Sequence, residues 1–195
     1  MEIKPVILNG EEVKLIPLSI KHIPELTCEA KDKDIWQYLP YGVVTTEEKI
    51  SNMIQFWLDR AERGIDLPFT VIYRSTELPI GNTRLLDINH QHKSVEIGGT
   101  WYGKKYQRTK VNTECKYLLL RFAFESLGCI RVQFKTDSLN IRSQNALERI
   151  GAVKEGILRN HMIRTDGSFR DSVYYSIVID EWAGVKEKLE EKLSN

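Results

Sequence analysis

The stretch SVEIGGTWYGKKYQRTKVNTECKYLLLRFAFESLGC, residues 94–129, decides the fold of this chain. Ser94–Trp101 has the composition and alternation of a strand, and a loop rich in lysine, arginine and threonine follows it. A long helix then begins near Asn112 or Thr113 and ends before Gly128. Apolar residues cover more than one face of this helix, which predicts that it is central and largely buried.

The elements on both sides of this stretch predict an α+β fold. A strand and two helices precede three strands, and a strand, a helix, two more strands and a terminal helix follow the buried helix. Such a meander that gives way to strand–helix–strand predicts a mixed, mostly antiparallel sheet flanked by helices, with one parallel strand pair. The chain has 195 residues and no internal repeat or linker, so we expect a single domain over residues 1–195.

The composition favours a soluble protein of the cytoplasm. Lysine and arginine number 28 against 27 aspartates and glutamates, a balance that gives no reason to expect nucleic acid or an anionic membrane as a partner. The apolar runs are too short to span a bilayer, and the N-terminus lacks the apolar stretch of a signal peptide. The three cysteines are far apart, which indicates reduced thiols, and the four histidines show no metal-ligand spacing.

The loop before the buried helix is a candidate anion site. Backbone N–H groups at a helix N-terminus and the helix dipole both favour a phosphate, and two basic side chains add positive charge. The alternative is a solvated basic loop that caps the helix and binds nothing. The residues concerned are Gln107, Arg108, Thr109, Lys110, Val111, Asn112 and Thr113.

Several short motifs carry a resemblance to a known family. They are Val95–Gly98, Tyr106–Gln107, Asn112–Glu114, Ala123–Glu125, Asn140–Ser143 and Arg149–Gly156. Together they resemble the GNAT N-acetyltransferases, and in particular the RimJ/RimL-like branch that acetylates the N-termini of ribosomal proteins. The resemblance extends over about the whole chain, with its specific motifs in the second half.

This resemblance implies a GNAT fold with a splayed parallel strand pair, and acetyl-CoA as the acyl donor. By the same resemblance the pantetheine arm pairs with the strand near Gly99, Thr100 and Trp101, and the diphosphate lies at residues 107–113. Asn140 would hold the pantetheine arm, and Ser143 would form a hydrogen bond with the sulfur atom.

Two departures from the family pattern concern the cofactor. Lys110 and Asn112 stand where the family has glycine and then glycine or alanine, and those residues let the backbone approach the phosphates. Leu147 stands where many members have the tyrosine that protonates the leaving thiolate. Both departures motivate the hypothesis of a non-catalytic binding module that kept the fold.

Two residues are candidates for the general base. Glu96 lies on the strand that leads into the cofactor loop, although it could equally be an exposed glutamate on the other strand face. His161 has a suitable intrinsic pKa and lies on a late strand, although a lone histidine is more often structural.

The acceptor is left open by the sequence. An α-amine of a protein or peptide and a small amine, such as a polyamine, an amino-acid derivative or an antibiotic, are the two enzymatic hypotheses. Aromatic residues at helical spacing favour a core position for Phe56 and Trp57, whereas Trp36, Tyr38 and Tyr41 fit either core or acceptor pocket. A homodimer through the sheet edge or the terminal helix also stays open.

Overall fold

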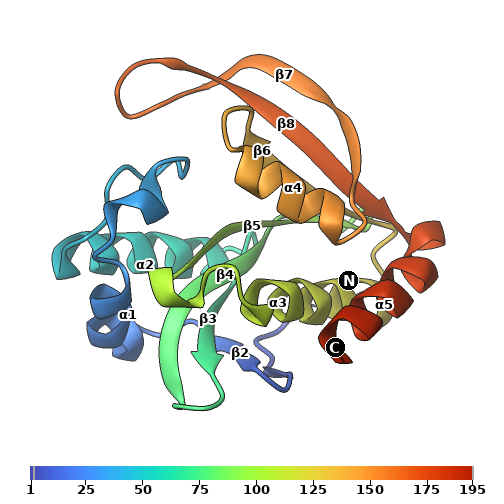
Figure 1. Ribbon diagram of the computed structural model, residues 1–195, viewed down its shortest axis with the longest axis horizontal. Coiled ribbons are helices and arrows are strands. Elements are labelled where there is room, and N and C mark those ends of the chain that lie inside the picture. Colours follow the sequence, from blue (N-terminus) through green and yellow to red (C-terminus); the bar gives the residue numbers. More distant parts are fainter. Residues whose placement is uncertain (2, 195) are drawn as a thin grey trace.

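A computed structural model describes residues 1 and 3–194, and its centre is an eight-stranded sheet (Figure 1). The strands lie in the order β1-β2-β3-β4-β5-β6-β8-β7. Their bounds are β1 Leu8–Asn9, β2 Val13–Pro17, β3 Leu67–Tyr73, β4 Leu78–Asn89, β5 Ser94–Tyr102, β6 Arg131–Asp137, β7 Val153–Ile163 and β8 Phe169–Val178. Neighbouring strands are antiparallel except β5 and β6, so the predicted mixed sheet with one parallel pair is confirmed.

The helices cover the sheet from both faces. Their bounds are α1 Ile23–Glu29, α2 Glu47–Glu62, α3 Lys110–Arg121, α4 Ile141–Arg149 and α5 Ile179–Ser194. One core cluster joins α3, α4 and α5 to the sheet, and a second joins α1 and α2 to Trp101. Trp101 and Tyr102 are consecutive on β5 and belong to different clusters, so the two clusters lie on opposite faces of the sheet.

Helix α3 is the central buried helix that the sequence predicts. Cys115, Leu118, Leu119 and Leu120 are each at most 1% exposed, and α5 packs beside the helix (Figure 1). It begins at Lys110, two residues earlier than the first predicted start, because Thr109 caps it by accepting a hydrogen bond from the Val111 amide. A π-helical turn, Phe122–Ser126, continues it toward Gly128.

Strands β7 and β8 form a long hairpin at the edge of the sheet, joined to the rest through β8 (Figure 1). Nearly every residue of β7 is exposed. No helix within residues 1 and 3–194 has the length and apolar character needed to cross a membrane.

Candidate active site

The parallel strands β5 and β6 separate soon after they begin. They pair only at Ser94↔Arg131, Val95↔Val132 and Glu96↔Gln133, although both strands continue beyond these residues. Gly99 lies past the last pair with a φ of +61°, and a Cβ there would lie 2.8 Å from Arg84 Nε. Glycine is therefore required at this bend, where one edge of β5 is left without a strand partner.

A cavity of about 1130 Å³ lies at this separation and extends to the start of α3. Most of the residues singled out from the sequence line it, and they come from β5, the following loop, α3 and α4. These are Glu96, Gly99, Thr100, Trp101, Gln107, Arg108, Thr109, Lys110, Asn112, Thr113, Asn140 and Ser143. Val111 and His161 are not among the lining residues, and the Val111 side chain is 1% exposed within the core.

The loop before α3 presents free backbone amides to this cavity. The N–H groups of Arg108, Thr109, Lys110 and Asn112 have no hydrogen-bond acceptor among the residues that the structure describes. Arg108 has a φ of +62°, so the left-handed turn falls on this residue. Lys110 and Asn112 are inside the right-handed helix, and their lack of a glycine therefore costs no backbone strain.

The side chains of this loop form hydrogen bonds with neighbouring elements at the edge of the cavity. Lys110 Nζ donates to the Leu193 carbonyl of α5, and Asn112 Oδ1 accepts a long hydrogen bond, 3.4 Å, from the Tyr102 hydroxyl. Gln107 bridges the Tyr102 carbonyl and the Arg142 guanidinium, at 3.2 and 2.9 Å. The loop is therefore fastened to β5, α4 and α5, and the cavity stays open above its amides.

Helix α4 brings Asn140 and Ser143 to the same cavity. Asn140 Oδ1 accepts a hydrogen bond of 3.0 Å from the Ser143 amide and so caps the helix. The Ser143 hydroxyl makes no hydrogen bond with any described residue, which leaves it available to a ligand. Leu147, where the family tyrosine was expected, lines the cavity and is 6% exposed.

Glu96 is buried, which removes the alternative of an exposed glutamate. It is 3% exposed, and its carboxylate lies 3.3 Å from Gln133 Nε2 and 3.5 Å from Lys135 Nζ. Burial raises the pKa of Glu96, and the Lys135 ammonium opposes this shift without cancelling it. The result is a carboxylate in the cavity that is more basic than an ordinary glutamate.

The other part of the cavity is lined by aromatic and charged side chains between α2 and β4. Arg84 is 6% exposed, donates to Asp66 and to the Tyr41 hydroxyl, and lies 4.7 Å from the Trp57 ring centroid. Trp57 is in the core, as predicted. The same prediction is wrong for Phe56, which is 54% exposed and lines the cavity, because it lies on the solvent side of α2.

Three further aromatic residues divide between core and cavity. Trp36 is 1% exposed and packs on Trp101 with ring centroids 5.1 Å apart, so it is a core residue. Tyr38 and Tyr41 line the cavity.

His161 lies on β7, outside the cavity lining. Its Nδ1 lies 3.1 Å from Ser172 Oγ, and its ring meets the Tyr174 ring edge-on. Burial lowers the pKa of His161, with Lys135 and Arg170 adding to the shift. His161 is itself exposed, like most of β7, and these contacts hold its ring against the surface of the hairpin.

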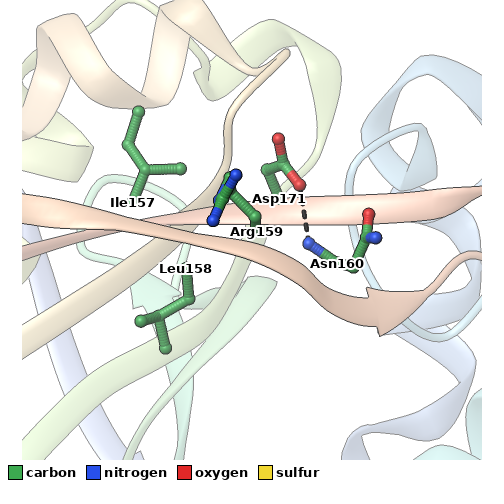
Figure 2. Close-up of a pocket in the computed structure, with 5 residues that line it drawn as sticks. All are labelled: Ile157, Leu158, Arg159, Asn160 and Asp171. Atoms are coloured by element: carbon green, nitrogen blue, oxygen red, sulfur yellow. Dashed lines mark hydrogen bonds between the residues drawn. The ribbon is translucent and has the colours of Figure 1, made fainter.

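A second hollow of about 610 Å³ lies on the same hairpin (Figure 2). Its wall consists of four consecutive β7 residues, 157–160, and Asp171, which accepts a hydrogen bond of 2.7 Å from the Asn160 amide. Asp171 is thus used to hold a bend in β7, and this hollow contains none of the residues predicted for the site.

Sequence reasoning missed Lys116 and Arg84, which are buried charged residues in the cavity wall. A lysine inside the apolar run of α3 was a signal for the first. Arg84 had no such signal, because it follows two other polar residues, Asn82 and Thr83, in the sequence of its strand.

The comparisons with known proteins agree with this geometry. The profile of the acetyltransferase (GNAT) domain family matches residues 12–153. A structure from T. thermophilus, provisionally described as an acetyltransferase, is 36% identical, has a TM-score of 0.89, and aligns over 99% of this chain and 100% of that one.

Two further matches are a curated relative and a solved structure with a bound CoA derivative. YdaF of Bacillus subtilis (strain 168), whose name gives a provisional assignment as a ribosomal N-acetyltransferase, is 32% identical over 54% of this chain and 57% of its own length. Mycobacterium smegmatis RimJ, solved in complex with CoA-disulfide, shares the fold with a TM-score of 0.84 at 18% identity, over 96% and 95% of the two chains.

The matched profile covers both the separating strands and the loop before α3. The chain therefore belongs to the GNAT acetyltransferase family, enzymes that take the acetyl group from acetyl-CoA.

Proposed function

We propose that this N-acetyltransferase acts on the α-amine of a protein or peptide, with acetyl-CoA bound along β5 and at the start of α3. The observation that carries the proposal is the convergence of three features on one cavity. These are the unpaired edge of β5, the free amides before α3 and the buried Glu96 carboxylate.

The residues present fit acetyl-CoA. The cavity wall holds nine lysine and arginine side chains and three aspartate and glutamate side chains, an excess of positive charge that suits a polyphosphate. Arg108 and the amides of residues 108–110 would hold the diphosphate. The free edge of β5 at Gly99–Trp101 offers main-chain groups to a pantetheine arm, in the way that a sheet edge accepts an added strand.

The chemistry assigned to this chain is a direct transfer. Acetyl-CoA supplies an activated thioester when bound. Glu96 removes a proton from the acceptor ammonium, directly or through one water, so that a neutral amine can attack. Backbone N–H groups at the separation of β5 and β6 polarise the thioester carbonyl. The free Ser143 hydroxyl donates a hydrogen bond to the sulfur that leaves.

The name of YdaF, a provisional assignment as a ribosomal N-acetyltransferase, supports the choice of a protein or peptide amine. The acceptor part of the cavity supports it too, since Phe56 is left exposed at its margin, where a peptide could pack. A screen of N-terminal peptides against small amines, with release of free CoA as the readout, tests this choice. Turnover with small amines alone would overturn it.

The cofactor site is tested by titration calorimetry with CoA, together with a serine variant. Ser143→Ala is expected to lower kcat about 10-fold or more, with the affinity for CoA kept within about twofold, because a donor acting mainly on the leaving group is lost. Ser75→Ala, in the exposed turn before β4, is the matched control. An unchanged kcat in Ser143→Ala would remove this residue from the reaction.

A further inference from the structure

The side chain of Lys116 lies inside the cofactor cavity, although it is a lysine of the buried helix α3. It is 6% exposed, and its Nζ donates a hydrogen bond of 2.9 Å to Thr100 Oγ1. The Phe134 ring centroid lies 5.9 Å from the same nitrogen. Thr100 belongs to β5 and Phe134 to β6, so the amine lies between the two strands that separate.

The charge of Lys116 has no counterion among the residues that the structure describes. Among residues 1 and 3–194, no carboxylate lies within ion-pair distance of its Nζ. Within the described part of the chain, Thr100 Oγ1 is the single acceptor for its three N–H bonds, and that oxygen also contacts Thr83 Oγ1 at 2.8 Å. A buried lysine without a carboxylate is costly, and such groups are concentrated where a protein uses the amine chemically.

Burial lowers the pKa of Lys116 to about 8. The titratable groups beside it are Cys115 on the same helix and Tyr102 on β5, whose hydroxyl interacts with the Cys115 thiol. Burial raises the pKa of the Cys115 thiol to about 12 and raises the pKa of Tyr102 as well, so neither is an anion near neutral pH. About one tenth of the Lys116 side chains are then neutral at pH 7, and about half at pH 8.

We propose that Lys116 is itself an acetyl acceptor, and that the chain acetylates this side chain when acetyl-CoA is bound without an amine substrate. The inference rests on the proposed binding of acetyl-CoA between β5 and β6. Unlike the proposed function, it concerns a modification of the chain rather than turnover of an acceptor.

The step balances without any further reactant. The lone pair of the neutral Lys116 Nζ attacks the acetyl carbonyl carbon, and an N–C bond forms as the C–S bond breaks. The electron pair of that bond goes to sulfur, which takes up the proton released by the nitrogen. The products are an Nε-acetyl-lysine and the free thiol of CoA.

The product suits its surroundings better than the ammonium does. An amide carries no charge, so the modification removes the counterion-free cation from beside Phe134 while the remaining N–H can still donate to Thr100. The added acetyl group would occupy cavity space between β5 and β6, so the acetylated chain is expected to bind acetyl-CoA more weakly.

The experiment follows a heavy-isotope acetyl group into the chain. Full-length protein is incubated with deuterated acetyl-CoA and no acceptor, between pH 6.5 and 9.5, and peptides are mapped by mass spectrometry. We expect one heavy acetyl group, on Lys116, with an initial rate that rises with pH and reaches half its maximum near pH 8. Lys116→Arg should abolish the label, whereas Lys188→Arg, at an exposed lysine of α5, should retain it.

The outcomes separate the two proposals. Heavy label spread over exposed lysines and absent from Lys116, in a sample whose melting temperature rises with CoA, overturns this inference alone. No thermal shift with CoA and no label overturns both. Lys116 could already carry unlabelled acetyl groups after purification. This result supports the inference if the Arg108→Glu variant, which is expected to bind the phosphates more weakly, is purified without acetyl groups on Lys116. It contradicts the inference if that variant carries them too.

Discussion

At the scale of single residues, Lys116 should make the free energy of unfolding depend on pH. Its folded-state pKa of about 8 lies below the ordinary value of 10.5, so between these values the unfolded chain holds a proton that the folded chain has lost. Raising the pH through this window therefore increases the free energy of unfolding, by about 3 kcal/mol when integrated. Lys116→Met should lack this increase and be more stable at pH 7.

Urea unfolding at several pH values measures the difference between this variant and the parent. Lys188→Met, at an exposed site, is the control and should follow the parent curve. If the free energy of unfolding of the parent does not increase from pH 8 to pH 10 relative to that of Lys116→Met, burial does not destabilise the charged form of Lys116.

Glu96 should control the acid side of the activity profile. Because burial raises its pKa, the base becomes competent at a higher pH than an ordinary glutamate, and kcat/KM should rise with a midpoint above 4.5. Glu96→Gln should lower kcat about 10²- to 10⁴-fold and remove this rise. Steady-state kinetics against pH measures both effects, with Glu187→Gln on the exposed face of α5 as control. A Glu96→Gln enzyme with the parent profile would exclude this base.

Single residues also show where sequence reasoning ends. The pattern identified most of the cavity-lining residues through the loop and the family motifs, yet the left-handed turn falls on Arg108 rather than on a glycine position. Arginine gives no local signal for a positive φ, so the turn could not be located in advance. The burial of Lys116 had one signal, its place in the apolar run of α3, but lysine is usually at the surface and tertiary packing decides its depth.

At the level of elements, α3 holds the first hairpin through one carboxylate. Glu114 is 4% exposed and accepts hydrogen bonds from the amides of Glu11, Glu12 and Val13, at 2.7 to 2.9 Å. Gly10 leaves room for this contact, since a Cβ there would lie 2.5 Å from the carboxyl carbon. The turn between β1 and β2 is thereby fixed to the buried helix.

Glu114→Gln tests this attachment. The amide side chain keeps the shape but turns one acceptor into a donor facing a backbone N–H, so we expect a loss of about 2 to 4 kcal/mol in the free energy of unfolding. Urea denaturation measures it, and Glu187→Gln serves again as the exposed control. A loss below about 0.5 kcal/mol would mean that the three amides find other partners.

The order of the elements was predictable because strand and helix periods differ and the turns carry glycine, asparagine or proline. The early separation of β5 and β6 was not predictable from periodicity, since Ile97–Tyr102 and Phe134–Asp137 have the pattern of ordinary strands. That feature came only from the family resemblance. The exposure of Phe56 was missed for a related reason, because α2 has apolar residues on more than the buried face.

For the whole molecule, the cavity predicts that acetyl-CoA and the acceptor are bound at the same time when the acetyl group is transferred. One continuous wall includes both the loop at Arg108 and the proposed acceptor side at Phe56, and none of the three cysteines belongs to it. Both substrates can thus be bound together, without a thioester on the enzyme. Initial-rate measurements should give intersecting double-reciprocal lines when both substrates are varied. Parallel lines would indicate a covalent acetyl-enzyme on the pathway.

β5 and β6 pair at only three residues, all near the start of the two strands. The sheet therefore consists of two parts, called leaves here, that are joined at one end of these strands. β1 to β5 form one leaf, and β6, β8 and β7 form the other. A pantetheine arm bound between the unpaired parts of β5 and β6 would bridge the two strands and make their connection more rigid. Deuterium uptake at the amides of 97–102 and 134–137 should therefore slow sharply when CoA is added, while the far edges of both leaves exchange as before.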